Sequence, residues 1–406
     1  MNVLVIQPGF PAEIPYFVRG LAEAGAKVLG LGDQPETMLP DVARESLHAY
    51  LRVTDLWDDQ GVVQALRQWR LPVKLDRVEC LWEPAMMLAA SLRTAFSLEG
   101  MDQDRTLLFR DKELMKQALD RAGLRCPRHR RARNKAGCIE ASKEIGFPVV
   151  IKPISGAGSA DTYRVENEAE LGRVLGRLGG VRETSIEEFI EGREYTFDTI
   201  CANGEILYYN IAWYRPNVLI ARSEEWISPQ TVTLRDLSSP HLQKGKELGE
   251  AVLRTLGFRT GFTHMEWFLT AKGEAVFGEI AARPPGGRSV ELMNYGCDID
   301  VFRGWGEAIV HGAWHRKIER KYNAAVIFKR ASGQGRIRRI DGLAQIYAKY
   351  GDHIVCNNLS KIGDPRRNWK QTLVSDGYLI VRHEDLETTL RMADEVGERL
   401  RLYAGP

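Results

Sequence analysis

Two acidic residues stand where a β-hairpin would bring them together. Residues 264–283 are predicted to form two strands joined at Lys272-Gly273, a dipeptide that suits a tight two-residue turn. A turn at this place pairs Glu266 with Glu279 across the hairpin. Opposed residues have Cβ atoms about 4.5 to 5.5 Å apart, so two carboxylates there repel each other unless something offsets their charge.

A divalent cation would offset that repulsion. Hard oxygen ligands on rigid strands suit Mg²⁺, which takes one or two carboxylates and completes its shell with water and substrate phosphate. A solvent-facing strand pair whose acids pair with lysines is an equally good interpretation of this segment alone. The same register pairs Phe268 with Phe277, and the alternation of side chains puts His264, Glu266, Glu279, Ala281 and Arg283 on one face.

Lys152 lies in an apolar segment, Val149-Val-Ile-Lys152-Pro153, that is predicted to be a buried strand. An unpaired ammonium group would be costly there and a phosphate would pair it, although a lysine that reaches solvent from a strand end is the common alternative. The next residues, Ser155-Gly156-Ala157-Gly158-Ser159, offer backbone N–H groups with little bulk, as a flap over phosphates needs. The lysine precedes the glycines, and the glycines join two strands, so this is not a Walker A loop.

An acidic connector, Glu187 to Glu194, leads into a strand-like run at 195–200. Such a segment can offer main-chain donors and acceptors to adenine and an acid to the ribose. An ordinary surface loop is the simpler interpretation of these residues taken by themselves.

The elements that must position these residues follow from periodicity. Residues 3–6, 16–24 and 27–31 predict a βαβ unit, and the first domain is predicted to be doubly wound. Its opening loop, Gln7-Pro8-Gly9-Phe10, lacks the G-x-G-x-x-G of a dinucleotide site. Further on, we expect a helix at 112–122 ended by Gly123, strands at 148–153 and 161–165, and a last helix at 385–402.

Charge and composition point to small-molecule partners. The 406 residues carry 56 Lys+Arg against 54 Asp+Glu, a net charge of +2, without the basic excess of a nucleic-acid binder. One basic stretch, Arg125, Arg128, His129, Arg130, Arg131 and Arg133, has no interleaved aromatic residues for stacking bases, so we interpret it as a solvated strand edge or linker.

Cysteine usage and hydropathy indicate a reducing, aqueous compartment. The six cysteines include no CxxC pair, which favours reduced thiols in a cytoplasmic protein over a disulfide framework or a zinc site. We expect neither a signal peptide nor a membrane span, because no apolar run approaches eighteen residues.

Five motifs occur in the order typical of the ATP-grasp superfamily, and the chain resembles the branch that includes D-alanine:D-alanine ligase, biotin carboxylase and the bacterial L-amino acid ligases. The motifs are Asp111-Lys112 before a helix, Pro148–Pro153 with its glycine flap, Glu187–Glu194, Gly261–Glu266, and Gly278-Glu279-Ile-Ala-Ala-Arg283-Pro-Pro-Gly-Gly287. Together they cover the chain from about residue 105 to 315.

The resemblance implies an α/β and α+β fold in three parts: an N-terminal Rossmann-like domain at 1–100, an ATP-grasp core at 101–320 with its lid at about 125–190, and a small C-terminal α+β domain at 321–406. It also implies ATP with Mg²⁺ or Mn²⁺ as cofactors, carboxylate and amine substrates, and a homodimer.

Roles for single residues are carried over from the same resemblance. Lys112 and Lys152 would contact the α- and β-phosphates beneath the flap of Ser155, Gly156 and Ser159. Glu188 and Ile190 would hold adenine through their backbones, with Glu187 and Phe189 lining that hinge and Glu194 holding the ribose. Glu266 and Glu279 would bind the metal, Arg283 would hold the transferred phosphate or the acyl oxyanion, and His264 and Arg288 are candidates for substrate contact, although a packed histidine and a surface arginine are equally good interpretations.

The family usually has Asn two residues after the second acid, where this chain has Ala281, which changes the metal geometry. With two lysines, two acids and an arginine but no nucleophilic Ser or Cys, the site suits phosphoryl transfer by positioning and charge neutralisation. We therefore expect a ligase that joins a carboxylate to an amine through an acyl phosphate, and the resemblance implies that the amine is an amino acid. The alternatives are a carboxylase that forms carboxyphosphate and a non-catalytic ATP-binding module.

Overall fold

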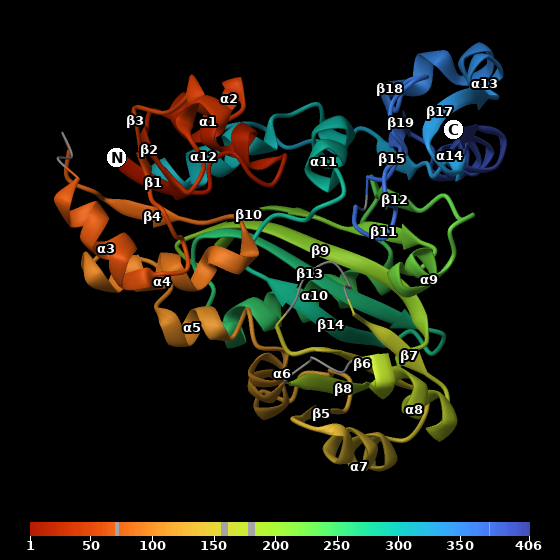
Figure 1. The fold of residues 1–406 in the computed structure, drawn as a ribbon, viewed down its shortest axis with the longest axis horizontal. Helices are drawn as coiled ribbons and strands as arrows, with labels where there is room; N and C mark the ends of the chain where they lie inside the picture. The colour runs from red at the N-terminus through yellow and green to blue at the C-terminus, as the bar shows by residue number, and fades with distance from the viewer. Residues whose placement is uncertain (70–72, 156–160, 178–182, 373) are drawn as a thin grey trace.

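The computed structural model of the chain describes residues 1–69, 73–155, 161–177, 183–372 and 374–406 (Figure 1). Its first part is a parallel sheet in the order β3-β2-β1-β4, in which β1 and β2 are joined by α1, so the predicted βαβ unit is confirmed. The strands are β1 (Asn2–Ile6), β2 (Lys27–Gly32), β3 (Ala49–Arg52) and β4 (Arg77–Glu79), and the helices around them are α1 (Ile14–Glu23), α2 (Asp41–Arg44), α3 (Asp59–Gln68), α4 (Met86–Ala95) and, from much later in the chain, α12 (Val301–His311).

Helices cover both faces of this parallel sheet. Val3 and Val5 of β1 pack in the same cluster as α1 and α12, whereas Leu4 and Ile6 pack in the cluster that contains α3 and α4. Alternate residues of a strand point to opposite faces, so a strand buried on both sides is apolar throughout. The first part of the chain is therefore doubly wound, as the sequence predicts.

The predicted helix after Asp111 is confirmed as α6 (Lys112–Arg121), which follows α5 (Gln103–Leu107). Asp111 caps it, because its Oδ1 accepts the backbone N–H groups of Glu113 and Leu114, each at 3.0 Å. Gly123 has a φ of +71°, a left-handed conformation that allows the chain to leave the helix.

A small antiparallel sheet follows, in the order β5-β8-β6-β7. Its strands are β5 (His129–Ala132), β6 (Val149–Pro153), β7 (Tyr163–Val165) and β8 (Thr184–Glu188), and one face packs on α7 (Lys135–Ile145) and α8 (Glu168–Arg177). Val149, Ile151 and Ile186 point into that apolar layer. Lys152 and Glu187, one residue along each strand, therefore point to the other face, toward the large sheet.

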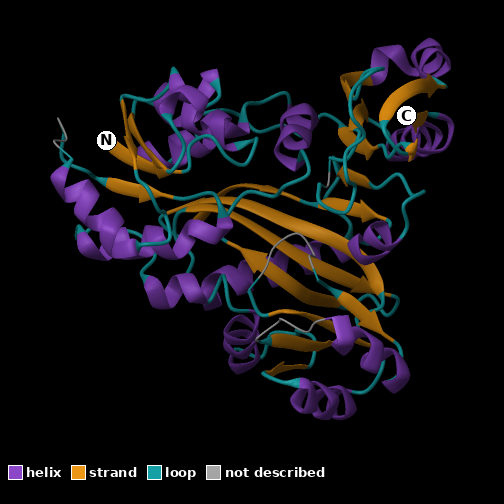
Figure 2. Cartoon of the chain, viewed as in Figure 1, coloured by secondary structure: helices purple, strands orange, loops and turns teal. Residues whose placement is uncertain are grey.

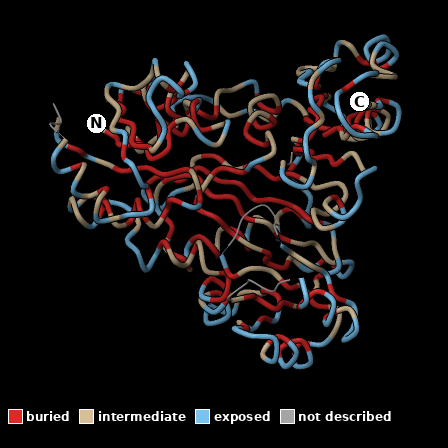
Figure 3. The backbone as a smooth tube through the Cα atoms, in the orientation of Figure 1, coloured by how far each residue is buried: buried red, intermediate tan, exposed pale blue. Residues whose placement is uncertain are grey.

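The large sheet crosses the whole molecule (Figure 2) and has the order β14-β13-β9-β11-β12-β15-β19-β18, with β10 also paired to β9. Buried residues concentrate along it (Figure 3). Its strands are β9 (Gly192–Ala202), β10 (Glu205–Asn210), β11 (Ala212–Arg215), β12 (Gln230–Thr233), β13 (Gly261–Thr270), β14 (Ala275–Ala281), β15 (Asn323–Phe328), β18 (Ile354–Leu359) and β19 (Gly377–His383), and two further helices near it are α9 (Val218–Ser223) and α11 (Ser289–Cys297).

Helix α10 (Pro240–Leu256) packs on the large sheet through glycines. A Cβ atom at Gly245 would lie 2.1 Å from the Trp267 ring, and one at Gly249 would lie 2.2 Å from the Phe197 ring. The two glycines therefore let the helix backbone approach the aromatic layer of β9 and β13 directly.

The last part of the chain continues the large sheet, because β15 pairs with β12 and then with β19. It adds β16 (Ser332–Gly333), β17 (Arg336–Asp341), β20 (Arg401–Gly405), α13 (Leu343–Tyr350) and α14 (Leu386–Arg399), the predicted last helix. The division at residues 100 and 320 stays a prediction. Within the described residues, none of the helices has the length and apolar character that a membrane span requires.

The hairpin of β13 and β14 differs from its prediction in two ways that cancel. The turn is longer than two residues, since β13 ends at Thr270 and β14 begins at Ala275. The register then shifts between Glu266 and Trp267, so Phe277 pairs with Trp267 and the predicted Phe268–Phe277 pair is wrong. Gly278 is the extra residue at this bulge, where a Cβ atom would lie 2.9 Å from the Glu266 carbonyl oxygen. Beyond the bulge, Glu266 pairs with Glu279, as predicted.

Candidate active site

A buried group of three lysines and two glutamates lies between the small sheet and the large one. Lys112 Nζ lies 3.0 Å from Glu279 Oε1, and Lys152 Nζ lies 3.5 Å from Glu279 Oε2. Glu187 contacts Lys152 at 3.0 Å and Lys116 at 2.9 Å. We call these five residues the lysine–glutamate cluster.

The lysine–glutamate cluster holds one more positive charge than negative. Burial alone would raise the pKa of Glu279, but Lys112, Lys152 and Lys116 outweigh it and hold that pKa at about 2. Burial acts on Glu187 in the same way, and the ammonium groups of Lys116 and Lys152 hold its pKa well below the usual range. Both acids are ionised at neutral pH, and the excess positive charge suits a polyphosphate, which accepts charge-assisted hydrogen bonds.

The surroundings of Lys152 contradict the interpretation that its side chain reaches solvent. Its side chain is 12% exposed, and its ammonium group lies between Glu187 and Glu279, so it does not reach out to solvent. The alternative interpretation of the hairpin was that its acids pair with lysines on a solvent-facing strand pair. Glu279 does pair with lysines, but it does so inside the molecule.

Glu266 belongs to a neighbouring buried group with His264 and Asp198. His264 Nδ1 lies 2.6 Å from Asp198 Oδ1, and its Nε2 lies 3.5 Å from Glu266 Oε1. Burial alone would lower the pKa of His264, but the hydrogen bonds to Asp198 and Glu266 raise it to about 9. The imidazolium therefore offsets part of the charge of Glu266. Ala281 of β14 lies opposite His264 of β13.

Arg283 is held by a residue from the first part of the chain. Its Nε donates to Glu83 Oε2 at 2.8 Å, and its Nη1 donates to the Pro284 carbonyl at 3.0 Å. The other oxygen of Glu83 accepts from Arg110, which precedes α6. One buried carboxylate thus orients two guanidinium groups from different segments.

The predicted adenine hinge joins the small sheet to β9. Glu188 N donates to the Arg128 carbonyl at 2.8 Å, and Phe189 N donates to the Pro148 carbonyl at 3.2 Å, which fixes the hinge backbone. Ile190 is buried, and the Arg164 guanidinium lies 4.0 Å from the Phe189 ring centroid.

Glu194 lies at the start of β9 and accepts the Val218 N–H at 2.8 Å. Burial, followed by the charge of Glu266, raises the pKa of Glu194 to about 8. The carboxyl group is therefore mostly protonated at neutral pH in the ligand-free protein, and it can donate as well as accept hydrogen bonds.

The remaining predicted residues lie elsewhere. Ser155 follows β6 and is exposed, whereas Gly156 and Ser159 lie outside the described residues. Arg288 sits in a different group of side chains: its Nη1 contacts Glu291 at 2.8 Å and Glu13 at 3.9 Å, and its guanidinium faces the Tyr378 ring.

Three residues of the site were missed by sequence reasoning. Lys116 is one helical turn after Lys112 on α6, and this i, i+4 spacing could have revealed it. Asp198 alternates with Thr196 and Glu194 along β9, which is a weaker signal. Glu83 comes from a distant segment, and nothing in its local sequence connects it with Arg283.

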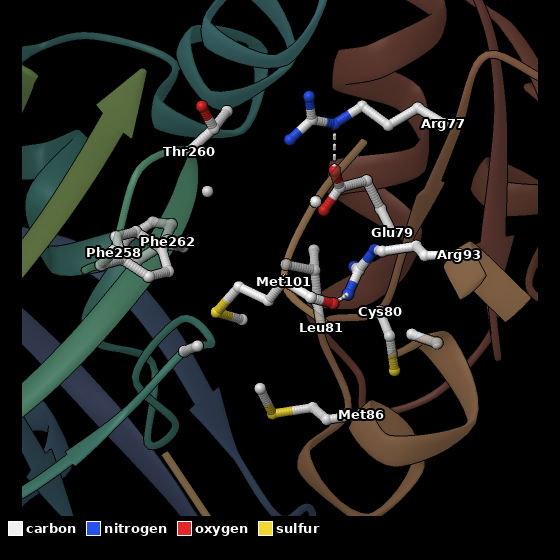
Figure 4. Close-up of a pocket in the computed structure, with 14 residues that line it drawn as sticks. Arg77, Glu79, Cys80, Leu81, Met86, Arg93, Met101, Phe258, Thr260 and Phe262 are labelled. Atoms are coloured by element: carbon white, nitrogen blue, oxygen red, sulfur yellow. Dashed lines mark hydrogen bonds and ion pairs between the residues drawn. The ribbon is translucent and has the colours of Figure 1, made fainter. Parts of the chain in front are cut away.

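A pocket behind the end of β14 is separate from this site (Figure 4). Ala282, the neighbour of Arg283, lines it together with Arg77, Glu79 and Phe262. Its volume of about 30 Å³ leaves room for a water molecule or two and not for a nucleotide.

Residues 145–291 match the sequence model of the ATP-grasp domain. The chain has the ATP-grasp fold. The matched ATP-grasp segment contains Lys152, the hinge, Glu266, Glu279 and Arg283, while Lys112, Lys116 and Glu83 precede it.

Proteins similar in sequence to this chain include a ligase and a synthase. It is 26% identical over 273 residues to the L-arginine-specific L-amino acid ligase of Bacillus subtilis, and this match covers 63% of the chain and 65% of that protein. It is 24% identical over 284 residues to the carbamoyl phosphate synthase large chain of Thermus thermophilus, which covers 66% of the chain and 26% of that protein. The chain thus spans less than two thirds of the length of either relative.

Solved structures share the ATP-grasp fold over the whole chain. The L-amino acid ligase of Bacillus licheniformis superposes with a TM-score of 0.80 at 19% identity and covers 100% of this chain and 99% of that one. The N5-carboxyaminoimidazole ribonucleotide synthetase of Thermotoga maritima superposes with a TM-score of 0.69 at 18% identity, with 100% and 99% covered.

Proposed function

We propose that this protein is an ATP- and Mg²⁺-dependent ligase that joins a carboxylate to an amine, with an amino acid among its substrates. The observation that carries this proposal is the buried lysine–glutamate cluster beside the paired acids Glu266 and Glu279. Its excess positive charge suits a nucleotide triphosphate, and its acids suit the accompanying metal.

ATP would lie between the small sheet and the large one. Lys112 and Lys152 would contact the α- and β-phosphates, and Lys116 would hold Glu187 in place between them. The backbone of Glu188 and Ile190 would bind adenine, and Glu194 would bind the ribose through the carboxyl group that burial keeps mostly protonated.

Mg²⁺ or Mn²⁺ would be held by Glu266 and Glu279, which the hairpin register places opposite each other. When bound, the ion would neutralise the phosphate oxygens and hold them in line for transfer. Ala281 supplies no ligand here, so a water molecule or a substrate oxygen would take the place that Asn fills in other members of the superfamily.

The proposed reaction needs no nucleophile from the protein. An oxygen of the substrate carboxylate attacks the γ-phosphorus, ADP leaves, and the acyl phosphate forms. The amine then attacks the acyl carbon, phosphate leaves, and the amide bond remains. Arg283, held by Glu83, would stabilise the charge that develops on the transferred group.

The relatives support two substrate classes. The L-arginine-specific L-amino acid ligase and the L-amino acid ligase structure favour an amino acid as substrate. The carbamoyl phosphate synthase and the N5-carboxyaminoimidazole ribonucleotide synthetase support the second candidate, a carboxyphosphate-forming enzyme. The two candidates are separated by which substrate class stimulates ATP turnover more, and we expect the difference to be tenfold or greater.

The test is a phosphate-release screen with Mg-ATP and all pairs of amino acids, with bicarbonate as a separate arm and mass spectrometry of the products. Amide product with ADP and phosphate in equal amounts supports the ligase. Turnover with bicarbonate alone would assign the carboxylase instead, and nucleotide binding without turnover in any arm would assign a non-catalytic module. Glu279→Gln is the inactive variant, and Glu247→Gln, at an exposed position of α10, is the matched control.

We also propose a homodimer that works in the cytoplasm. The resemblance to the ligase superfamily motivates the dimer, and the five buried free cysteines suit a reducing compartment. Light scattering after size exclusion, at a mass of 45.8 kDa or twice that value, tests the oligomeric state.

A further inference from the structure

Three chemically different metal ligands meet at the corner between α6 and β5, on the side of the small sheet away from β7. They are Asp120 in the last turn of α6, Cys126 in the connection, and His129 at the start of β5. One ligand atom from each lies within 4.8 Å of the others. In the described parts of the chain, no other three His, Cys, Asp or Glu residues come together in this way.

The two oxygens of Asp120 face the other two ligands separately. Oδ1 lies 2.9 Å from the Cys126 sulfur, and Oδ2 lies 2.9 Å from His129 Nε2. Ligands of a tetrahedral zinc ion with bonds of 2.0 to 2.3 Å lie roughly 3.3 to 3.8 Å apart. Each of the two contacts of Asp120 is therefore within about 1 Å of that spacing. The sulfur and Nε2 lie within 4.8 Å of each other, so small movements of the three side chains would complete a zinc-binding arrangement.

His129 is oriented as metal-binding histidines are. Its other ring nitrogen, Nδ1, lies 3.0 Å from Glu113 Oε2, and Glu113 is itself held by Gln117 at 3.0 Å. A carboxylate on the far nitrogen fixes the tautomer and directs the lone pair of Nε2 to the metal. Both His129 nitrogens thus face carboxylates. The imidazolium donates to both of them, and a neutral ring that donates from Nδ1 to Glu113 leaves Nε2 free to bind a cation.

Burial and access also suit a bound ion. Cys126 and His129 are each 6% exposed, whereas the Asp120 side chain is 55% exposed. The site is therefore enclosed by its sulfur and nitrogen ligands and open at its oxygen ligand, which leaves a path for the metal and a position for water.

From these contacts we propose that Asp120, Cys126 and His129 bind Zn²⁺ or a similar borderline-soft divalent ion, with water as the fourth ligand and Glu113 as the supporting carboxylate. Sulfur and imidazole ligands select such ions over Mg²⁺. Binding displaces the thiol proton of Cys126 and the Nε2 proton of the His129 imidazolium to solvent, and no electron is transferred. The ion links α6, which carries Lys112 and Lys116, to the small sheet.

The experiment uses the full-length protein, stripped with a chelator, kept reduced, and titrated with Co²⁺ as the spectroscopic probe. Wild type gives a near-ultraviolet thiolate-to-cobalt charge-transfer band together with intense visible bands of a tetrahedral ion, and Zn²⁺ removes both. Cobalt bound by the carboxylate oxygens of Glu266 and Glu279 and the imidazole nitrogen of His264 has no sulfur ligand and gives no thiolate band. The band therefore distinguishes the two sites.

The variants make the assignment specific. Cys126→Ser loses the thiolate band. The control Cys356→Ser, which removes a partly exposed thiol on β18, keeps it. Asp120→Asn changes a side chain that is 55% exposed, and it weakens Co²⁺ binding at least tenfold. Glu113→Gln weakens it by about 10- to 100-fold, as loss of a supporting carboxylate does. Absence of a thiolate band in wild type, or its persistence in Cys126→Ser, overturns the proposal.

Discussion

Glu83 and Arg283 are 200 residues apart in sequence, and Glu83 Oε2 accepts a hydrogen bond from Arg283 Nε at 2.8 Å. Glu83 belongs to the short 3₁₀ turn after β4, whereas Arg283 follows β14 of the large sheet. The first part of the chain thus orients the arginine to which we assign the transferred phosphate. Breaking a buried ion pair by removing one partner costs about 3–5 kcal/mol, so the contact also ties the two regions together.

Glu83→Gln should lower kcat by roughly 10- to 100-fold with little change in the KM for ATP, because a misplaced Arg283 loses contact with the transition state and not with the nucleotide. Steady-state kinetics test this, and circular dichroism checks the fold. Glu247→Gln, on the exposed face of α10, should keep wild-type kcat. A purely structural role for Glu83 would show as a lower Tm with kcat per folded molecule unchanged.

Glu279→Gln should reduce Mg²⁺-dependent ATP turnover by at least about 100-fold, since it removes a charged metal ligand. The sequence alone suggests that losing this acid relieves repulsion from Glu266, but the structure shows that it also removes a negative charge that both Lys112 and Lys152 contact. The variant should therefore be less stable than wild type, and thermal unfolding measures this. Turnover near the wild-type value would contradict the assignment of the metal site.

The raised pKa of Glu194 makes stability depend on pH. Its carboxyl group has a pKa of about 8 in the folded chain against an ordinary value of 4.5, so the folded state binds the extra proton between these values. The stabilisation is complete below pH 4.5 and is lost as the pH rises to about 8. The free energy of unfolding of wild type should fall by about 1 kcal/mol per pH unit in this window because of Glu194. The free energy of unfolding of Glu194→Gln should not show this contribution.

Urea unfolding of wild type and Glu194→Gln at several pH values measures the difference. His264, with a pKa of about 9, changes stability in the same direction in both proteins. The free energy of unfolding of Glu194→Gln relative to wild type should thus rise with pH. Parallel curves would show that folding does not shift the pKa of Glu194.

If the substrate carboxylate is phosphorylated, ATP should become ADP and phosphate and never AMP and pyrophosphate. With ¹⁸O in that carboxylate, one label should appear in the released phosphate, because the attacking oxygen leaves with phosphorus when the amine arrives. Mass spectrometry of phosphate and nucleotide reports this. Label in AMP, or phosphate without label during product formation, would reject the acyl-phosphate mechanism.

The sequence predicted local elements well because their signals are local. The cap at Asp111, the βαβ unit and the hairpin all depend on residues a few positions apart. The Glu266–Glu279 pair was predicted correctly although the turn was wrong, because the bulge at Gly278 shifted the register back by one residue. Bulges depend on neighbouring strands as well as on the turn, and sequence spacing does not contain that information.

Long-range contacts are where sequence reasoning stopped. The pairing of β12 with β15 joins segments about 90 residues apart, and the contact of Glu83 with Arg283 has no periodic signal. The group of Asp120, Cys126 and His129 was missed for a different reason: a search for cysteine pairs excludes a site with one cysteine, although its three ligands span ten residues.

The glycine contact between α10 and the large sheet bears on how natural variants of this chain should be judged. Gly245 is not among the residues that we propose to bind ATP. Replacing it by alanine would be expected, from helix propensity alone, to stabilise α10. The added methyl carbon would meet the Trp267 ring at 2.1 Å, and Trp267 is the residue next to Glu266 on β13. Room for it would come from a displacement of the buried Trp267 ring, of the helix or of the strand that carries this acid, so we expect a conservative-looking allele at this glycine to lower stability and activity.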